Sequence, residues 1–127
     1  MSNIPEALRY TKDHEWAKME DGRARIGITD HAQQELTDVV FVELPRVGKV
    51  VKQGEPIGVV ESVKAVSEIF APLSGTVVEV NKVLEDRPEI VNKDPYGEGW
   101  IVVLQTADAS EPNGLMDAAG YRAHIGD

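Results

Sequence analysis

The residues most suggestive of chemistry surround Lys64, which stands at the centre of a near-mirror in the sequence. Directly opposed residues on antiparallel strands stabilise one another, so a mirrored sequence predicts a β-hairpin. We expect Lys64 and Ala65 to form a two-residue loop, which would hold the lysine amine far from the core. The residues expected to face each other match in type: Val63 and Val66, Ser62 and Ser67, Glu61 and Glu68, Val60 and Ile69, Val59 and Phe70.

This expected loop departs from two rules for hairpins. Two-residue loops favour Asn-Gly, Asp-Gly or Gly-X, because the favoured turns need a positive φ, and Lys64-Ala65 offers neither Gly nor Asn. The mirror would also oppose Glu61 and Glu68, and like charges opposite each other destabilise a ladder. Such departures tend to mark functional or strained sites. We therefore expect Lys64 to be presented to a partner; the alternative is an ordinary solvated lysine.

The other residue types that perform catalysis lack the spacing that catalysis needs. The three histidines, His14, His31 and His124, form no ligand motif such as HExxH. His14 and Glu15 could meet His31 at a metal, but histidines with ordinary hydrogen bonds are the simpler interpretation. We assign neither a metal site nor a catalytic residue. A catalytic lysine is usually buried, whereas an exposed lysine suits acylation by a carrier cofactor, so we expect a non-enzymatic carrier.

The composition limits the partners of the chain. Its 127 residues suit one domain, 1–127, and 42% of them are apolar. The net charge of −9 argues against nucleic acid or an anionic membrane as a partner. Cysteine is absent, so any redox chemistry must come from an added group. No apolar run is long enough for a membrane span, and no signal or transit peptide is seen, so we expect a cytoplasmic monomer.

The periodicity predicts short strands separated by turns, which favours a small β sandwich or flattened barrel. Thr29 or Asp30 is expected to cap a short helix that ends near Leu36. Residues 81–89 are expected to form a polar loop, followed by a short apolar return at Ile90-Val91. The other expected elements are strands at 16–19, 24–28, 39–44, 57–60, 76–80 and 100–104, and a C-terminal helix over about 113–125.

Several motifs together resemble the lipoyl-lysine region and its flanking segments in the glycine cleavage system H proteins. The resemblance implies a mainly β, barrel-sandwich hybrid fold of the lipoyl/biotinyl type, with a core over about 8–106 and lipoate in amide linkage to Lys64. A biotin carrier usually flanks its lysine with methionines, whereas Val63 and Ala65 flank Lys64 here. The motifs run in order: His14-Glu15-Trp16, Gly27 to Gln33, Val40 to Pro45, Glu61 to Ala65, Ala71 to Gly75, Val78 to Asn81 and Asn92 to Trp100.

The resemblance also implies a shuttle in a bacterial cytoplasm. Such a carrier takes the aminomethyl group of glycine from glycine decarboxylase, a pyridoxal-phosphate enzyme, to a folate-dependent aminomethyltransferase. Dihydrolipoamide dehydrogenase then reoxidises the lipoyl group, which a lipoylating enzyme has attached. One alternative is a lipoate relay or regulatory paralogue that never meets glycine decarboxylase. Another is a small hydrolase or metal enzyme, against which the missing motifs argue.

The resemblance further implies a cleft for the loaded lipoyl arm. In the family the arm folds back into a surface cleft, where acidic side chains hold its protonated amine. The matching positions here are Glu15 and Glu68, with Asp13 nearby. Position 68 is more often Asp in the family, so Glu68 keeps the charge while its side chain is longer. A carboxylate near the hairpin tip would offset a cationic aminomethyl group.

Overall fold

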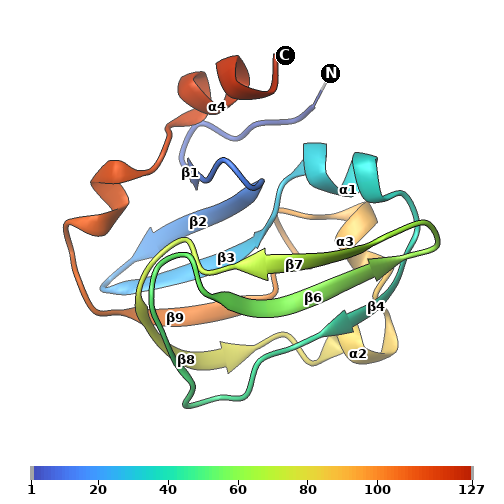
Figure 1. Cartoon of the computed structure of the whole chain (residues 1–127), viewed down its shortest axis with the longest axis horizontal. Helices are drawn as coiled ribbons and strands as arrows, with labels where there is room; N and C mark the ends of the chain where they lie inside the picture. The colour runs from blue at the N-terminus through green and yellow to red at the C-terminus, as the bar shows by residue number, and fades with distance from the viewer. Residues whose placement is uncertain (1, 127) are drawn as a thin grey trace.

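The computed structural model describes residues 2–126, which form two antiparallel sheets and several short helices (Figure 1). The larger sheet has the strand order β1-β2-β3-β9-β8-β5, and the smaller sheet has the order β4-β6-β7. The mainly β architecture predicted from the sequence is therefore confirmed. The strands are β1 (Arg9–Tyr10), β2 (Glu15–Glu20), β3 (Arg23–Ile28), β4 (Val39–Glu43), β5 (Val50–Val51), β6 (Pro56–Ser62), β7 (Val66–Phe70), β8 (Gly75–Val80) and β9 (Val102–Thr106).

The main core lies between the two sheets. Side chains alternate across a strand, so every second residue of these strands can face the core. Val60 on β6 and Ile69 on β7 pack in one buried cluster with Ile26 on β3, Val77 on β8 and Leu104 on β9. Val60 and Ile69 anchor the hairpin of β6 and β7 in this cluster. The turn that carries Lys64 therefore extends from two strands that are packed against the core.

The short helices confirm some sequence predictions and correct others. Helix α1 (Asp30–Leu36) begins where predicted, and the Thr29 hydroxyl accepts the N–H of Ala32 as its N-cap. Residues 81–89 contain a helix, α2 (Val83–Asp86), and Ile90-Val91 begins another, α3 (Ile90–Lys93). The loop expected over 81–89 and the short apolar return expected at Ile90-Val91 were wrong, because a short apolar run fits a helical turn as well as a strand.

The C-terminal helix is shorter than predicted. Helix α4 spans Ala118–Ile125, and a separate 3₁₀ turn, η1 (Glu111–Gly114), precedes it. Asp117 caps α4 by accepting the N–H of Gly120 at 2.8 Å, so the helix starts at this cap and not near 113. The predicted start was too early because Leu115 fits the helical spacing of Ala118 and Arg122, although it lies before the cap.

A second apolar cluster joins the N-terminal segment around β1 to α4, which lie side by side in Figure 1. The rings of Tyr10 and Tyr121 stack with centroids 4.7 Å apart, and the hydroxyl of Tyr10 donates to the carbonyl of Pro5 at 2.6 Å. Trp16 is fully buried in this cluster, and its indole N–H donates to the carbonyl of Pro95 at 3.0 Å. The stacked tyrosine rings hold α4 against β1, and the indole hydrogen bond ties the start of β2 to the loop after α3.

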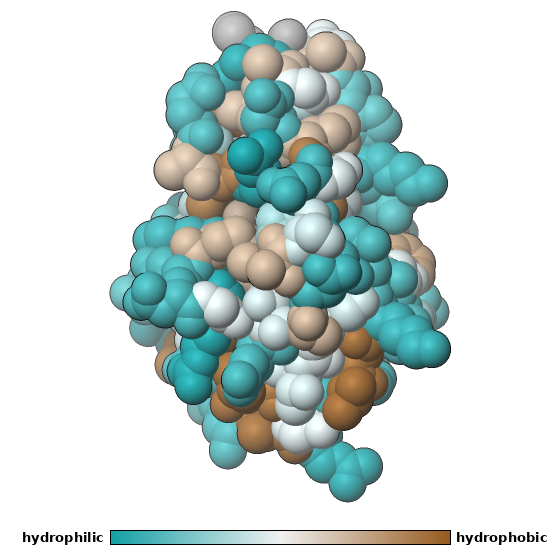
Figure 2. Space-filling model, turned by 90° about the vertical axis from the view of Figure 1, so that its left-hand side faces the viewer, coloured by the Kyte–Doolittle hydropathy of each residue, from teal (hydrophilic) through white to brown (hydrophobic). Residues whose placement is uncertain are grey.

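The surface is mostly polar, with apolar atoms gathered toward the lower end of the face in Figure 2. No helix within residues 2–126 is long and apolar enough to cross a membrane. The large apolar side chains exposed on the described part of the chain are Met19, Val40, Phe41, Val47, Val50, Val63, Val66 and Val83.

Candidate functional site

Lys64 lies at the tip of the hairpin formed by β6 and β7, which projects beyond α1 at the right of Figure 1. The hairpin was predicted, but its register differs from the mirror by two residues. Glu61 pairs with Val66, and Glu68 pairs with Val59, so the two glutamates do not oppose each other. A shift of two residues keeps each side chain on its original face, because the side-chain period of a strand is two. The observed register therefore separates the carboxylates without exposing the core.

Ser62 fixes the turn at the hairpin tip. Its backbone N–H donates to the carbonyl of Ala65 at 2.8 Å, which makes Val63 and Lys64 the central residues of the turn. The predicted loop of Lys64 and Ala65 was wrong by one residue. The Ser62 hydroxyl also accepts the N–H groups of Lys64 at 3.3 Å and Ala65 at 3.1 Å. This side chain stabilises the turn locally, and neither Val63 nor Lys64 has a positive φ.

A cleft of about 290 Å³ begins beside the hairpin tip, and we call it the α1–β7 cleft. It runs along β7 from Ala65, the neighbour of Lys64, to Ile69. The three acidic residues predicted for the site, Asp13, Glu15 and Glu68, all line it. The complete lining consists of Asp13, His14, Glu15, Ile28, Ala32, Glu35, Leu36, Val60, Ala65, Val66, Ser67, Glu68 and Ile69.

Glu15 is the buried carboxylate of the α1–β7 cleft, with 2% of its surface exposed. One oxygen accepts the hydroxyl of Thr11, and the other accepts the backbone N–H of Phe70 at 3.1 Å. Burial raises the pKa of Glu15 to about 7, although both hydrogen bonds oppose that rise, and the charge of Asp13 adds to it. At neutral pH the group is therefore poised between its two forms, and a nearby cation would favour the carboxylate.

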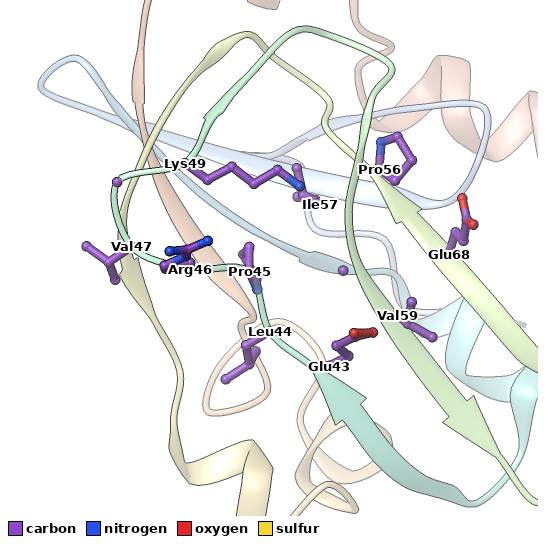
Figure 3. Close-up of a pocket in the computed structure, with 12 residues that line it drawn as sticks. Glu43, Leu44, Pro45, Arg46, Val47, Lys49, Pro56, Ile57, Val59 and Glu68 are labelled. Carbon is purple, nitrogen blue, oxygen red and sulfur yellow. The ribbon is translucent and has the colours of Figure 1, made fainter.

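Glu68 differs from Glu15 because it is exposed on the edge strand β7. It also lines a larger groove of about 740 Å³ on the side of the β4–β5 loop (Figure 3). In that groove Glu43 and Glu68 lie on the strands, while Arg46 and Lys49 lie on the loop. The larger groove is lined by none of residues 60–67, so the α1–β7 cleft is the one beside Lys64.

The structure brings His14 and His31 together, with ring centroids 4.7 Å apart. The third group beside them is Glu35 on α1, and not Glu15 as the sequence suggested. Sequence reasoning also missed three positioning residues. Thr11 contacts Glu15, Ser62 fixes the turn that carries Lys64, and Tyr121 contacts His14. The spacing of His31 and Glu35, four residues apart on a predicted helix, was the one signal that could have found Glu35.

Known proteins match this chain over almost its whole length. The family model for the Glycine cleavage H-protein matches residues 8–127. The Glycine cleavage system H protein of Herpetosiphon aurantiacus is 58% identical over 127 residues, covering 100% of this chain and 97% of that protein. The Glycine cleavage system H protein of Geobacillus kaustophilus is 57% identical over 123 residues, covering 97% of each.

A solved structure agrees with the sequence comparisons. The crystal structure of a glycine cleavage system H protein from Mycobacterium marinum superposes with a TM-score of 0.90 at 43% identity. It covers 98% of this chain and 100% of the other, so the two share the same fold throughout. The matching family model, the full-length relatives and this structure together show that the chain belongs to the family of glycine cleavage H proteins, the carrier components of the glycine cleavage system.

Proposed function

We propose that Lys64 carries the lipoyl group of this family in amide linkage, and that the chain shuttles the aminomethyl group of glycine. The observation that carries the proposal is the position of an exposed lysine on a turn fixed by Ser62, directly beside the α1–β7 cleft. The proposed donor is glycine decarboxylase, the acceptor is aminomethyltransferase, and dihydrolipoamide dehydrogenase restores the oxidised arm. The setting is the cytoplasm of a bacterium, which the bacterial relatives support.

The residues around Lys64 fit an attached lipoyl group. Lys64 is exposed, and its side chain takes part in none of the ion pairs between described residues. The cleft offers apolar walls from Ile28, Leu36 and Ile69 and a buried carboxylate from Glu15. The bound group supplies a redox-active pair of sulfur atoms, which a chain without cysteine does not have.

The role proposed for Glu15 is to hold a protonated amine inside the α1–β7 cleft. The Thr11 hydroxyl and the Phe70 N–H fix both of its oxygens, so the carboxylate needs little reorganisation when a cation enters. Burial strengthens a charge-assisted contact because water screens it less. Glu68 and Asp13 are exposed, and we propose that they add negative charge at the edge of the cleft.

Reconstitution with the three partner enzymes tests this proposal. The lipoylated chain, purified glycine decarboxylase, aminomethyltransferase with tetrahydrofolate, and dihydrolipoamide dehydrogenase are combined, and glycine-dependent release of ammonia is measured. We expect release with the native chain and with Lys52→Arg, a control at another exposed lysine, and none with Lys64→Arg. A lipoylated native chain that supports no release would contradict the shuttle and favour a lipoate relay.

A further inference from the structure

A cluster of metal-ligating side chains lies at one wall of the α1–β7 cleft, and the carrier function does not use it. His14, His31 and Glu35 each offer one ligand atom, and these atoms all lie within 4.8 Å of one another. The three come from two separate elements, the turn before β2 and helix α1. Two neutral imidazoles and one carboxylate form the ligand set of several zinc and non-haem iron sites in proteins.

Helix α1 places two of the three groups side by side. His31 and Glu35 are four residues apart on the helix, and Nε2 of His31 lies 3.5 Å from Oε1 of Glu35. Zn–N and Zn–O bonds of about 2.0–2.1 Å put two ligand atoms on one tetrahedral ion about 3.3 Å apart. The pair on α1 is therefore already near the required separation, and only His14 has to approach.

Two features position His14 for that approach. Its backbone has a φ of 73°, which is uncommon for a residue other than glycine and costs free energy. Its Nδ1 lies 2.8 Å from the hydroxyl of Tyr121, which itself lies 2.8 Å from the hydroxyl of Thr29. A metal-bound histidine usually donates its other ring N–H to a carboxylate, a backbone carbonyl or water, which fixes the tautomer and leaves one nitrogen for the metal. The Tyr121 hydroxyl can accept the N–H of His14 in the same way.

The hydrogen bonds around His14 remain satisfied when its Nε2 binds a cation. Nδ1–H then donates to Tyr121, the Tyr121 hydroxyl donates to Thr29, and Thr29 still accepts the N–H of Ala32 at the start of α1.

We propose that His14, His31 and Glu35 form a binding site for a divalent transition-metal ion of the zinc class. Three protein ligands leave at least one coordination position open. His14 and Glu35 both line the α1–β7 cleft, so the bound ion borders the space beside Lys64. This inference concerns the polypeptide alone and does not require lipoylation.

The third histidine of the chain provides a matched control. The ring of His124 lies with its centroid 5.9 Å from that of His14, but its Nε2 is 3.0 Å from the carbonyl of Lys12, and it is not one of the three ligands. His124→Gln therefore removes an imidazole from the same neighbourhood without removing a ligand.

The test is isothermal titration of ZnCl₂ into the full, unlipoylated chain, freed of metal by a chelator and carrying no polyhistidine tag. We expect one saturable site, with affinity at least about tenfold weaker in His31→Gln, Glu35→Gln and His14→Asn, where Asn tolerates the positive φ. Tyr121→Phe is also expected to weaken binding by about tenfold, since second contacts of this kind are worth that much. His124→Gln should retain the native affinity within about twofold.

A measurement on the native chain does not depend on whether the variants fold. In an amide ¹H–¹⁵N spectrum, ZnCl₂ is expected to shift the signals of residues 13–15 and 29–36 first. Absence of a saturable site, shifts confined to exposed carboxylates elsewhere, or an equal loss of affinity in His124→Gln and His31→Gln would each overturn the proposal.

Discussion

The backbone N–H of Phe70 donates a hydrogen bond of 3.1 Å to the buried carboxylate of Glu15. This bond joins β2 of the larger sheet to β7 of the smaller sheet, 55 residues apart in the chain. The residue proposed to hold the cargo thus also ties the Lys64 hairpin to the rest of the molecule. If Glu15 holds the cargo as proposed, stability and cargo binding are coupled through one titrating group.

The stability of the metal-free protein should fall as pH rises through the titration of Glu15. Its pKa is about 7 in the folded chain against an ordinary 4.5, so the folded state holds a proton that the unfolded state has lost. The stabilisation that this proton gives the folded state is fully present below about pH 4.5 and is lost as the pH rises to about 7. Its total contribution to the free energy of unfolding is at most about 3 kcal/mol.

Urea unfolding at pH 5, 6, 7 and 8 in the presence of EDTA measures this dependence. Glu15→Gln cannot ionise, so the free energy of unfolding of the native chain relative to this variant should decrease by up to the same amount between pH 5 and 8. Parallel pH profiles for the two proteins would show that Glu15 is already ionised across this range.

The cargo should be lost faster when the cleft carboxylates are neutralised. A partly buried contact between a carboxylate and an ammonium group is worth about 1–2 kcal/mol, which is roughly five- to thirtyfold in a rate or equilibrium. Non-enzymatic ammonia release from the aminomethyl-loaded chain should accelerate by about this factor in Glu15→Gln with Glu68→Gln. The control is Glu79→Gln, an exposed glutamate on β8, and equal rates in all three proteins would argue against the cleft assignment.

The hairpin tip should depend on the Ser62 hydroxyl. Ser62→Ala leaves the N–H groups of Lys64 and Ala65 without their acceptor, so we expect a loss of about 1 kcal/mol and slower lipoylation of Lys64 in vitro. Ser67→Ala, an exposed serine on the same hairpin, should be lipoylated at the native rate. If Ser62→Ala is also lipoylated at the native rate, the ligase reads the local peptide and not the turn.

Gly75 should be essential to the larger sheet for a steric reason. A Cβ at this position would collide with the carbonyl oxygen of Gln105 on β9, the strand paired with β8. Gly75→Ala should destabilise the protein by about 3 kcal/mol, as overpacking of a rigid site does. Gly114→Ala, where a Cβ meets nothing within 4 Å, should change the free energy of unfolding by less than about 0.5 kcal/mol.

Sequence reasoning predicted what depends on local pattern. The neighbouring strands expected at 16–19 and 24–28 and the Thr29 cap of α1 depend on residues close in the sequence, and both are present. The mirror around Lys64 predicted a hairpin but not its register, because registers two residues apart bury the same faces. The hydrogen bond to the Ser62 hydroxyl and the separation of Glu61 from Glu68 favour the observed register over the mirrored one. Matching residues by type takes no account of either effect.

The parts of the site that sequence could not provide are contacts between distant segments. Tyr121 reaches His14 across 107 residues, and Phe70 reaches Glu15 across 55. The raised pKa of Glu15 follows from its burial between the two sheets, which no local pattern reveals. The resemblance to the family indicated that Glu15 and Glu68 belong to one cleft, but only the structure distinguishes the buried carboxylate from the exposed one.

The carrier role of Lys64 is tested most directly by finding where a lipoyl group is attached to the chain. The chain is produced in cells that contain lipoate and a lipoylating enzyme, and its intact mass and proteolytic peptides are measured by mass spectrometry. We expect one lipoyl increment, located on Lys64, in the native chain and in Lys52→Arg, and no increment in a folded Lys64→Arg variant. Attachment at Lys52 or Lys82, or an increment that persists in Lys64→Arg, would contradict this role.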